Sequence, residues 1–258
     1  MAVGAKAHMS IEELSIGLDR PPTRLGLESA ALFLDLDGTL APIVARPQDV
    51  GPDPRRTSLL QTLNGRLNGR LAVVSGRSLS DIDHILEGRV TCVAAIHGLV
   101  RRDASGVVGE APPHPGLAVA RGMIEDFASG DQRLIVEDKG LSLTLHFRLA
   151  PDRAQEAIDL AERLAMLTGL TLQPGDMVME LRTPGASKGD AIRAFMAEAP
   201  FRGARPVFLG DDLTDEHGFF AVRQLGGYGI LVGPQRRTTA VYRMDDVDGA
   251  LDWLEAAR

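Results

Sequence analysis

Cysteine is almost absent from this sequence, because Cys92 is the single cysteine among 258 residues. A lone cysteine cannot form a disulfide within the chain, and it excludes a zinc site built from several cysteines. Long apolar runs are also missing. The uncharged stretch from Val90 to Val100 is much shorter than the roughly 20 apolar residues that span a membrane. These absences predict a cytoplasmic protein without a membrane partner, since a chain that avoids disulfides suits a reducing compartment.

Positive charge is scarce. The chain has 28 Lys and Arg against 35 Asp and Glu, a formal net charge of −7, and its only lysines are Lys6, Lys139 and Lys188. Nucleic-acid binding needs clustered positive charge to neutralise phosphates, so we expect no nucleic-acid partner. Hydrophobic residues make up 44% of the chain, which is enough for a sizeable core.

Short apolar runs that end in polar or glycine-rich turns recur along the sequence. Such runs are typical of strands buried on both faces of a parallel sheet. They are Ala30–Asp35, Leu71–Val74, Cys92–Ile96, Pro206–Leu209 and Gly229–Val232. Helical patterns accompany them at Arg56–Leu67, Leu79–Leu86, Lys188–Ala199 and Thr214–Leu225. The alternation predicts an α/β fold with a doubly wound, Rossmann-like parallel sheet.

The middle of the chain has a different pattern. A helical stretch that ends near Ala128 precedes two predicted strands, Arg133–Val136 and Ser142–Phe147, with a turn between them. Ser142, Thr144 and His146 alternate with apolar residues there, which is typical of a half-buried strand. A predicted helix, Asp152–Leu167, and predicted strands Leu170–Gln173 and Met177–Leu181 follow. We expect residues 112–185 to form an inserted α+β cap, residues 30–111 and 186–258 the core, and residues 1–29 a partly disordered N-terminal extension.

Two carboxylates follow the first predicted strand, in the motif Asp35-Leu36-Asp37-Gly38-Thr39-Leu40. Ligands bind at the carboxyl ends of the strands in open α/β sheets. Two carboxylates so close together repel each other unless a cation or a shared proton is present. Such oxygen ligands suit a Mg²⁺ ion that is bound beside a substrate phosphate. Asp35 could then attack phosphorus while Asp37 handles the proton.

A second acidic cluster, Gly210–Glu216, follows the predicted strand Pro206–Leu209. Asp212 and Thr214 are residue types that cap helices, and acids favour the first helical turn. Capping explains two of the four acids and leaves the others without a reason. The remaining charge indicates that Asp211 is a metal ligand.

Two further residues suit a phosphate site. Ser75 stands at the end of the predicted strand Leu71–Val74, where a hydroxyl and backbone N–H groups can hold phosphate oxygens. Lys188 opens a predicted helix in a chain that has very few lysines. Its ammonium could pair with both a carboxylate and a phosphate, although a solvated lysine is the ordinary alternative.

Together these motifs resemble the haloacid dehalogenase superfamily of phosphatases, and most closely the bacterial trehalose-6-phosphate phosphatases. The resemblance runs from about residue 30 to residue 255. It implies that Asp35 is the nucleophile, that Asp37 is the general acid and base, and that Ser75 and Lys188 hold the phosphoryl group. It also implies Mg²⁺ as the cofactor, bound by Asp35, Asp211 and the main-chain oxygen of Asp37.

The resemblance extends to residues around the reacting groups. Glu137, Lys139 and Glu180 match cap positions that contact the disaccharide, and Arg77 and Glu216 are further candidate substrate-binding residues. We expect Thr39, Asp212 and Asp215 to support the site from behind these groups, and His97 and His146 to be structural. Without the resemblance, Glu137 and Lys139 would be interpreted as a solvated turn pair.

These observations predict a monomeric, Mg²⁺-dependent phosphatase that hydrolyses trehalose 6-phosphate through an aspartyl-phosphate. One alternative is a phosphatase for another sugar phosphate, such as sucrose 6-phosphate or mannosyl-3-phosphoglycerate. The other is a binding or regulatory domain that has lost activity. The presence of all the acids and of the lysine disfavours this last alternative.

Overall fold

The structure is a computed structural model that describes residues 17–44 and 46–257. The expectation of disorder in the N-terminal extension includes residues 1–16, which lie outside the described residues. The described part of the extension packs on the core. Leu25 and Leu27 are buried, and the Pro22 carbonyl accepts a hydrogen bond of 2.7 Å from the Trp253 indole. None of the described helices is long and apolar enough to span a membrane.

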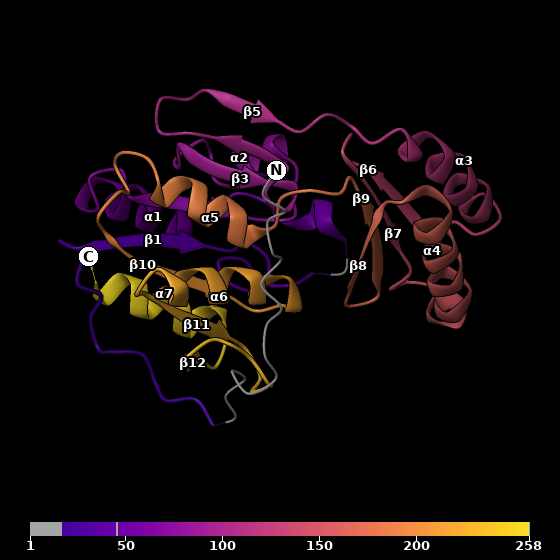
Figure 1. Cartoon of the computed structure of the whole chain (residues 1–258). Coiled ribbons are helices and arrows are strands. Elements are labelled where there is room, and N and C mark those ends of the chain that lie inside the picture. The colour runs from indigo at the N-terminus through magenta and orange to yellow at the C-terminus, as the bar shows by residue number, and fades with distance from the viewer. Residues whose placement is uncertain (1–16, 45, 258) are drawn as a thin grey trace.

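An eight-stranded sheet forms the core, and most of its neighbouring strands are parallel (Figure 1). The strand order is β12-β11-β10-β1-β2-β3-β4-β5. The bounds are β1 Ala30–Leu34, β2 Leu71–Val74, β3 Cys92–Ala95, β4 Val100–Arg102, β5 Val108–Glu110, β10 Arg205–Gly210, β11 Tyr228–Val232 and β12 Tyr242–Met244. Strand β1 lies between β10 and β2 and is parallel to both. The predicted parallel α/β core is confirmed.

Helices cover both faces of this sheet. The bounds are α1 Pro54–Arg66, α2 Leu79–Ile85, α5 Lys188–Met196, α6 Glu216–Gln224 and α7 Val247–Ala256. Helices α1, α2 and α7 bury leucines and isoleucines in one hydrophobic cluster. Helices α5 and α6 bury Phe195 and Phe219 in the other cluster, against Phe33 and Phe208 of the sheet. Burial of β1 on both faces explains why it has no polar residue before Asp35.

The inserted segment folds as a four-stranded antiparallel sheet with two helices on one face (Figure 1). The strand order is β6-β7-β9-β8. The bounds are α3 Gly116–Ala128, β6 Ile135–Asp138, β7 Ser142–His146, α4 Ala154–Thr168, β8 Thr171–Gly175 and β9 Val178–Arg182. Leu143 and Leu145 pack with α3 and α4 in a third hydrophobic cluster. The predicted α+β cap is confirmed, and we propose residues 112–185 as its limits because all these elements lie between them.

Beyond shifts of a few residues at the ends of elements, the structure differs from the predicted elements in three main respects. Strands β4 and β5 extend the parallel sheet with antiparallel pairs, because the short turns around them leave no room for a crossover helix. Strand β12 and helix α7 were not predicted. Strand β6 begins at Ile135 rather than at Arg133, because the Asp131 carboxylate accepts a hydrogen bond from the Arg133 amide and holds a turn there. Glu137 consequently belongs to the strand and not to the turn.

Candidate active site

The centre of the site is an ion pair between Asp35 and Lys188. Asp35 follows β1, and Lys188 is the first residue of α5, whose N-terminus is capped by Ser187 and Asp190. Both side chains are buried, and Lys188 Nζ lies 2.9 Å from Asp35 Oδ1. The same ammonium donates a hydrogen bond of 2.7 Å to Asp215 Oδ1. Burial disfavours the ammonium, but Asp215 and Asp35 outweigh it and raise the pKa of Lys188, so this lysine is charged at neutral pH.

A third carboxylate, Asp211, completes the cluster. Oxygens of Asp35, Asp211 and Asp215 all lie within 4.8 Å of one another. The Asp211 side chain fits against Gly38, whose φ of +75° forms the tight turn after β1, and a Cβ at that position would overlap the Asp211 carboxylate. One lysine faces three carboxylates here, so the cluster carries excess negative charge.

This charge changes the acidity of two of the carboxyl groups. Burial and the neighbouring Asp215 raise the pKa of Asp35 well above its usual range. The same two causes raise the pKa of Asp211 to about 7. Buried like charges are costly unless they are neutralised. A divalent cation between the carboxylates would supply the missing positive charge.

The residues present fit such a cation. Asp211 Oδ1 is buried and accepts no hydrogen bond within the described part of the chain, so it is free to ligate. Asp215 is less suited, because Lys188 occupies Oδ1, and Oδ2 accepts hydrogen bonds from the Asp211 and Asp212 amides at 2.9 and 3.0 Å. Asp215 therefore orients the loop and the lysine, and Asp35 and Asp211 are the carboxylates left for the metal.

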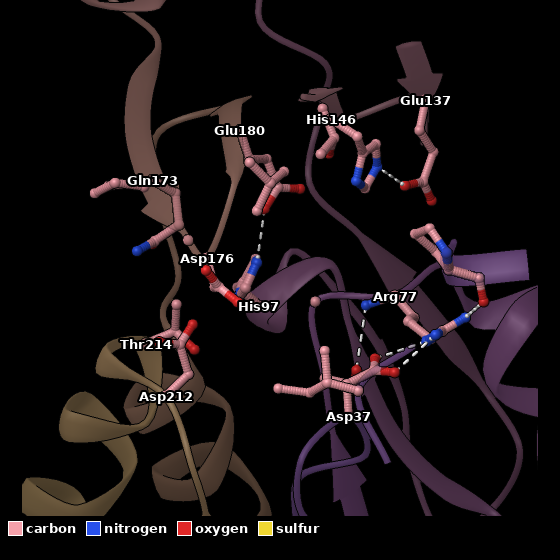
Figure 2. A pocket seen from close by; sticks show the side chains of 18 of the residues that line it. Asp37, Arg77, His97, Glu137, His146, Gln173, Asp176, Glu180, Asp212 and Thr214 are labelled. Carbon is pink, nitrogen blue, oxygen red and sulfur yellow. Dashed lines mark hydrogen bonds and ion pairs between the residues drawn. The ribbon is translucent and has the colours of Figure 1, made fainter. Parts of the chain in front are cut away.

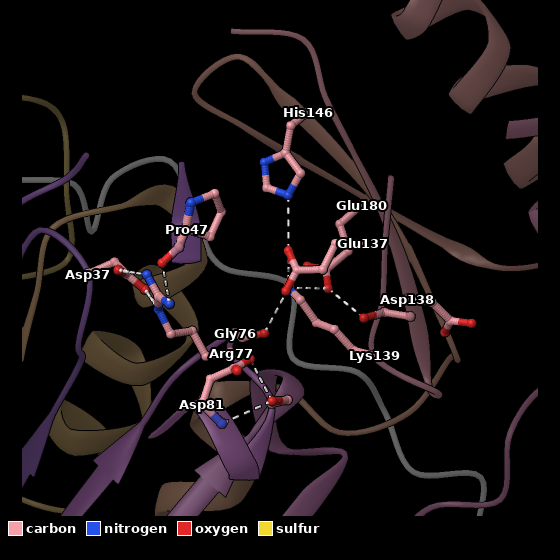
Figure 3. A network of polar contacts seen from close by, with 12 residues as sticks. Asp37, Pro47, Gly76, Arg77, Asp81, Glu137, Asp138, Lys139, His146 and Glu180 are labelled. Carbon is pink, nitrogen blue, oxygen red and sulfur yellow. Dashed lines mark hydrogen bonds and ion pairs between the residues drawn. The ribbon is translucent and has the colours of Figure 1, made fainter. Parts of the chain in front are cut away.

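Asp37 is held by an arginine. Arg77 donates two hydrogen bonds to the Asp37 carboxylate, at 2.6 and 2.7 Å, and a third of 2.8 Å to the Pro47 carbonyl (Figure 3). Two parallel bonds of this kind fix the plane of a carboxylate. Ser75 lies beside this pair, buried, with its hydroxyl accepting a hydrogen bond of 3.2 Å from the Arg77 amide.

The cap contacts the core through Glu180 and Lys139. Glu180, in β9, accepts a hydrogen bond of 2.6 Å from the Ser142 hydroxyl and lies 2.8 Å from Nε2 of His97 in the core. Lys139 donates a hydrogen bond of 3.1 Å to the Gly76 carbonyl and lies 3.4 Å from Glu180 (Figure 3). Burial alone would raise the pKa of Glu180, but Lys139 and His97 lower it far below its usual value. The Glu180 carboxylate is therefore ionised and joins cap to core.

Glu137 lies on the same face of the cap sheet. Its carboxylate is 2.9 Å from Nε2 of His146 and 3.9 Å from Lys139. Burial opposes ionisation of this carboxyl, but His146 and Lys139 prevail and lower its pKa. Glu137, Lys139 and Glu180 thus form one charged cluster opposite the carboxylates of the core.

A cavity of about 310 Å³ lies between the cap face and the core. Figure 2 shows Glu137, Glu180 and Gln173 of the cap opposite Asp37, Asp212 and Thr214 of the core. Ten of the predicted site residues line it, namely Asp35, Asp37, Ser75, Arg77, Glu137, Lys139, Glu180, Lys188, Asp211 and Asp212. The volume lies at the lower end of the range of small-molecule sites.

Three predicted residues do not line the cavity. Asp215 and Thr39 are buried behind it. The Glu216 carboxylate accepts hydrogen bonds of 2.8 Å from the Thr239 amide and hydroxyl and pairs with Arg236. Arg236 in turn donates hydrogen bonds to the Asp211 and Asp212 carbonyls, at 3.2 and 2.8 Å.

The structure adds cavity residues that the sequence did not single out for binding. The polar ones among them include Thr144, His146, Arg148, Gln173 and Asp176 of the cap, and His97 and Thr214 of the core. The alternation of polar and apolar residues along 142–147 contained the signal, since one face of that strand is polar. The sequence alone does not indicate that this face of the strand points toward Asp35.

The raised pKa of Asp211 leads to a testable dependence of stability on pH. Without metal the folded-state pKa is about 7, and the unfolded value is about 3.9. Between these two pH values the folded chain therefore binds more protons than the unfolded chain does. The stabilisation that Asp211 contributes is consequently full below about pH 4 and is lost as the pH rises toward about 7. Asp211→Asn is neutral at every pH and lacks this loss.

We expect the melting temperature of Asp211→Asn, in a chelator, to rise above that of the wild type as the pH increases from about 5 to about 8. Calorimetry of both proteins across this range measures the difference. Mg²⁺ should then stabilise the wild type by mass action and the variant far less. A difference in melting temperature that stays constant with pH would contradict the argument.

The fold and the cluster define the class of protein. An aspartate after a central parallel strand, a buried lysine, a second acidic loop and an inserted cap together form a hydrolase of the haloacid dehalogenase type. The model of the family described as trehalose-phosphatase matches residues 33–248. The chain therefore belongs to the trehalose-phosphatase family.

Individual relatives agree with this assignment. The chain is 39% identical over 233 residues to the trehalose-6-phosphate phosphatase of Escherichia coli K12, with 87% of this chain and 85% of that protein covered. It is 36% identical over 229 residues to a probable trehalose-phosphate phosphatase of Sinorhizobium fredii, with 88% and 86% covered. A solved trehalose-6-phosphate phosphatase related protein superposes with a TM-score of 0.72 at 29% identity, over 88% of this chain and 96% of that one.

A further structure shows the fold alone. The C-terminal domain of trehalose-6-phosphate phosphatase from Candida albicans superposes with a TM-score of 0.81 at 20% identity, over 93% of this chain and 97% of that one.

Proposed function

We propose that this protein is a phosphatase that hydrolyses trehalose 6-phosphate to trehalose and phosphate, with Mg²⁺ as cofactor. The observation that carries the proposal is the cluster of Asp35, Asp211 and Asp215 around Lys188, in a chain of the trehalose-phosphatase family. The cluster lies beneath a cap whose side chains toward the cavity are mostly polar. Such an arrangement has groups for the phosphate on one side and groups for sugar hydroxyls on the other.

In the first half of the reaction, a carboxylate oxygen of Asp35 attacks phosphorus and the bond from phosphorus to the sugar oxygen breaks. Asp37 gives its proton to that oxygen, so trehalose leaves neutral. The product is an aspartyl-phosphate on Asp35. Lys188 and the Ser75 hydroxyl hold the phosphoryl oxygens during the transfer, where the charge develops.

In the second half, water attacks phosphorus and the bond to Asp35 breaks. Asp37, now a carboxylate, takes the proton from that water, and phosphate leaves with the Asp35 carboxylate restored. Both halves need Asp37 in one orientation relative to Asp35. The paired hydrogen bonds from Arg77 supply that orientation.

Asp35, Asp211 and the main-chain carbonyl of Asp37 would hold the metal. Bound Mg²⁺ supplies positive charge to the phosphoryl oxygens and offsets the repulsion between Asp35 and Asp211. Asp215 and Thr39 support these groups from behind, and Asp212, which lines the cavity, caps the short helix that follows Asp211. For Glu216 we propose a positioning role rather than direct contact, because its carboxylate holds Arg236 against the loop that carries Asp211.

Glu137, Lys139 and Glu180 would contact the disaccharide. All three line the cavity; Lys139 pairs with both glutamates, and each glutamate also lies within hydrogen-bond distance of a histidine. Charged side chains that are already fixed in place bind hydroxyl groups with little loss of conformational entropy. Cap closure over the substrate would also exclude bulk water from Asp35.

Phosphate release from a panel of sugar phosphates, with and without Mg²⁺, tests the function. The panel contains trehalose 6-phosphate, sucrose 6-phosphate, mannosyl-3-phosphoglycerate and glucose 6-phosphate. We expect the highest kcat/KM for trehalose 6-phosphate, and no release in a chelator. Preference for another sugar phosphate would replace the proposed substrate. No turnover of any phosphate ester would favour the alternative of a silent binding domain.

We propose further that the chain acts as a monomer in the cytoplasm. Within the described part of the chain, the residues that line the cavity all come from one copy. The single cysteine is buried. Light scattering after size exclusion should give the mass of one chain at micromolar concentration, and a stable dimer would contradict this.

The geometry around Arg77 predicts a loss of activity that depends on the leaving group. Arg77→Lys keeps the charge but lacks the two-pronged contact with Asp37. We expect kcat for trehalose 6-phosphate to fall about 10²-fold, at the lower end of the roughly 10²- to 10⁴-fold contribution of general acid catalysis, because the lysine still holds one oxygen of Asp37. The cleavage step of p-nitrophenyl phosphate, whose leaving group needs no proton, should be nearly unchanged in the burst phase.

Arg102→Lys is a matched control, because Arg102 forms the same two-pronged contact with Asp83 at 2.7 Å and does not line the cavity. It should leave both activities as in the wild type. If Arg77→Lys lost the same factor of activity on trehalose 6-phosphate and on p-nitrophenyl phosphate, Arg77 would not act through the proton on Asp37.

A further inference from the structure

Four polar residues form a row across the cap sheet. The register of the strands pairs Glu137 with Thr144, Thr144 with Glu180, and Glu180 with Gln173. All four line the cavity. Side chains directly opposite each other on neighbouring strands have Cβ atoms about 4.5–5.5 Å apart, so the row is continuous.

Thr144 is the buried member of the row whose side chain lacks a partner within the described part of the chain. It is 3% exposed, and its hydroxyl makes no hydrogen bond within the described part of the chain. A buried hydroxyl without a partner is unfavourable. Valine has the same shape and would remove that cost, so the sheet itself does not require a hydroxyl at this position. Thr144 lines the cavity, so a polar ligand that packs against it would supply the missing partner.

The neighbours of Thr144 already have their own hydrogen-bonding partners. Glu180 Oε1 accepts a hydrogen bond from the Ser142 hydroxyl, and Oε2 faces His97. Glu137 Oε2 faces His146. The Thr144 hydroxyl, which can donate one hydrogen bond and accept others, is therefore left for a polar group that enters the cavity.

We propose that Thr144 is a specificity-determining residue whose hydroxyl binds a hydroxyl group of the sugar part of the substrate. The inference rests on the proposed function, because Lys188 and Ser75 hold the phosphate on the core side and leave the sugar to the cap. Thr144 lies at the centre of the row, between the two carboxylates. A sugar hydroxyl there accepts from Thr144 and donates to a neighbouring carboxylate, which distinguishes a polyol from an apolar ester.

Thr144→Val and Thr144→Ser test the inference as a matched pair. Valine keeps the shape and removes the hydroxyl, and serine keeps the hydroxyl. A neutral hydrogen bond corresponds to a change of about 2- to 12-fold, so we expect kcat/KM of Thr144→Val for trehalose 6-phosphate to fall by about that factor, mainly through KM. Thr144→Ser should stay within about 2-fold of the wild type, and trehalose should inhibit Thr144→Val more weakly as a competing product.

Hydrolysis of p-nitrophenyl phosphate provides the internal control, because this ester has no sugar hydroxyl. Thr144→Val should hydrolyse it as the wild type does, and its melting temperature should not fall. The inference would be overturned if Thr144→Val kept the KM and the trehalose inhibition of the wild type. It would also be overturned if the variant lost as much kcat/KM on p-nitrophenyl phosphate as on trehalose 6-phosphate. If the wild type does not hydrolyse trehalose 6-phosphate, the proposed function is wrong, but the inference about Thr144 is not yet decided. The same pair of variants then tests Thr144 on the sugar phosphate that the panel prefers.

Discussion

Asp35→Asn should abolish phosphate release from trehalose 6-phosphate. The amide cannot attack phosphorus, and we expect kcat to fall by a factor of about 10⁴ or more, as for other nucleophile replacements. The fold should survive the change. Burial, together with Asp215 and Asp211, raises the pKa of Asp35, so a neutral amide at this position avoids the cost of a buried negative charge. Steady-state phosphate release and thermal melting measure the two effects.

An exposed carboxylate is the matched control for this variant. Asp248→Asn makes the same chemical change at a side chain that is 87% exposed, and it should keep full activity. A wild-type melting temperature together with lost activity in Asp35→Asn locates the effect in the chemistry. Turnover within about 10-fold of the wild type would exclude Asp35 as the nucleophile.

Lys188→Met should impair both activity and stability. The Lys188 ammonium is the shared partner of Asp35 and Asp215, at 2.9 and 2.7 Å, and its removal leaves buried carboxylates without a cation. Breaking a buried ion pair from one side costs about 3–5 kcal/mol, which lowers the melting temperature by on the order of 10 °C in a chain of this size. Loss of the positive charge at the phosphoryl group should lower kcat by about 10²- to 10³-fold.

A double variant separates these two effects. Lys188→Met with Asp215→Asn removes one of the unpaired charges, so the melting temperature should recover in part while kcat stays low. Recovery of activity together with stability would mean that Lys188 acts only as a structural residue. Calorimetry and phosphate release on the three proteins decide between these outcomes.

The core of the fold was predictable because its central strands are buried on both faces. Strands such as β2, Leu71–Val74, appear in the sequence as unbroken apolar runs and were located from it. Strand β5, Val108–Glu110, is exposed along its whole length and has no such pattern. The antiparallel edge of the sheet was therefore missed.

The candidate site was predictable only where chemistry is concentrated in short motifs. Asp35, Asp37 and Asp211 follow buried strands, and the carboxyl ends of parallel strands lie at one edge of the sheet. The position of Asp215 against Lys188 was not predictable, because an acid in the first turn of a helix also favours that turn for electrostatic reasons.

Contacts between the cap and the core depend on the packing of two separate domains. His97 and Glu180 lie 2.8 Å apart in the structure, but they are far apart in the sequence and belong to different domains. Local patterns cannot indicate such a pair. The same holds for Arg77 and Asp37, whose contact needs the loops after β1 and β2 to lie side by side.

The most direct test of the account is to trap the covalent intermediate. A first turnover of the wild type with radiolabelled trehalose 6-phosphate and Mg²⁺ is stopped in acid, and the labelled peptide is identified by mass spectrometry. We predict label on Asp35, released by hydroxylamine as expected for an acyl phosphate, and no label in Asp35→Asn. Label on any other residue, or turnover without covalent label at every time point, would contradict attack by Asp35.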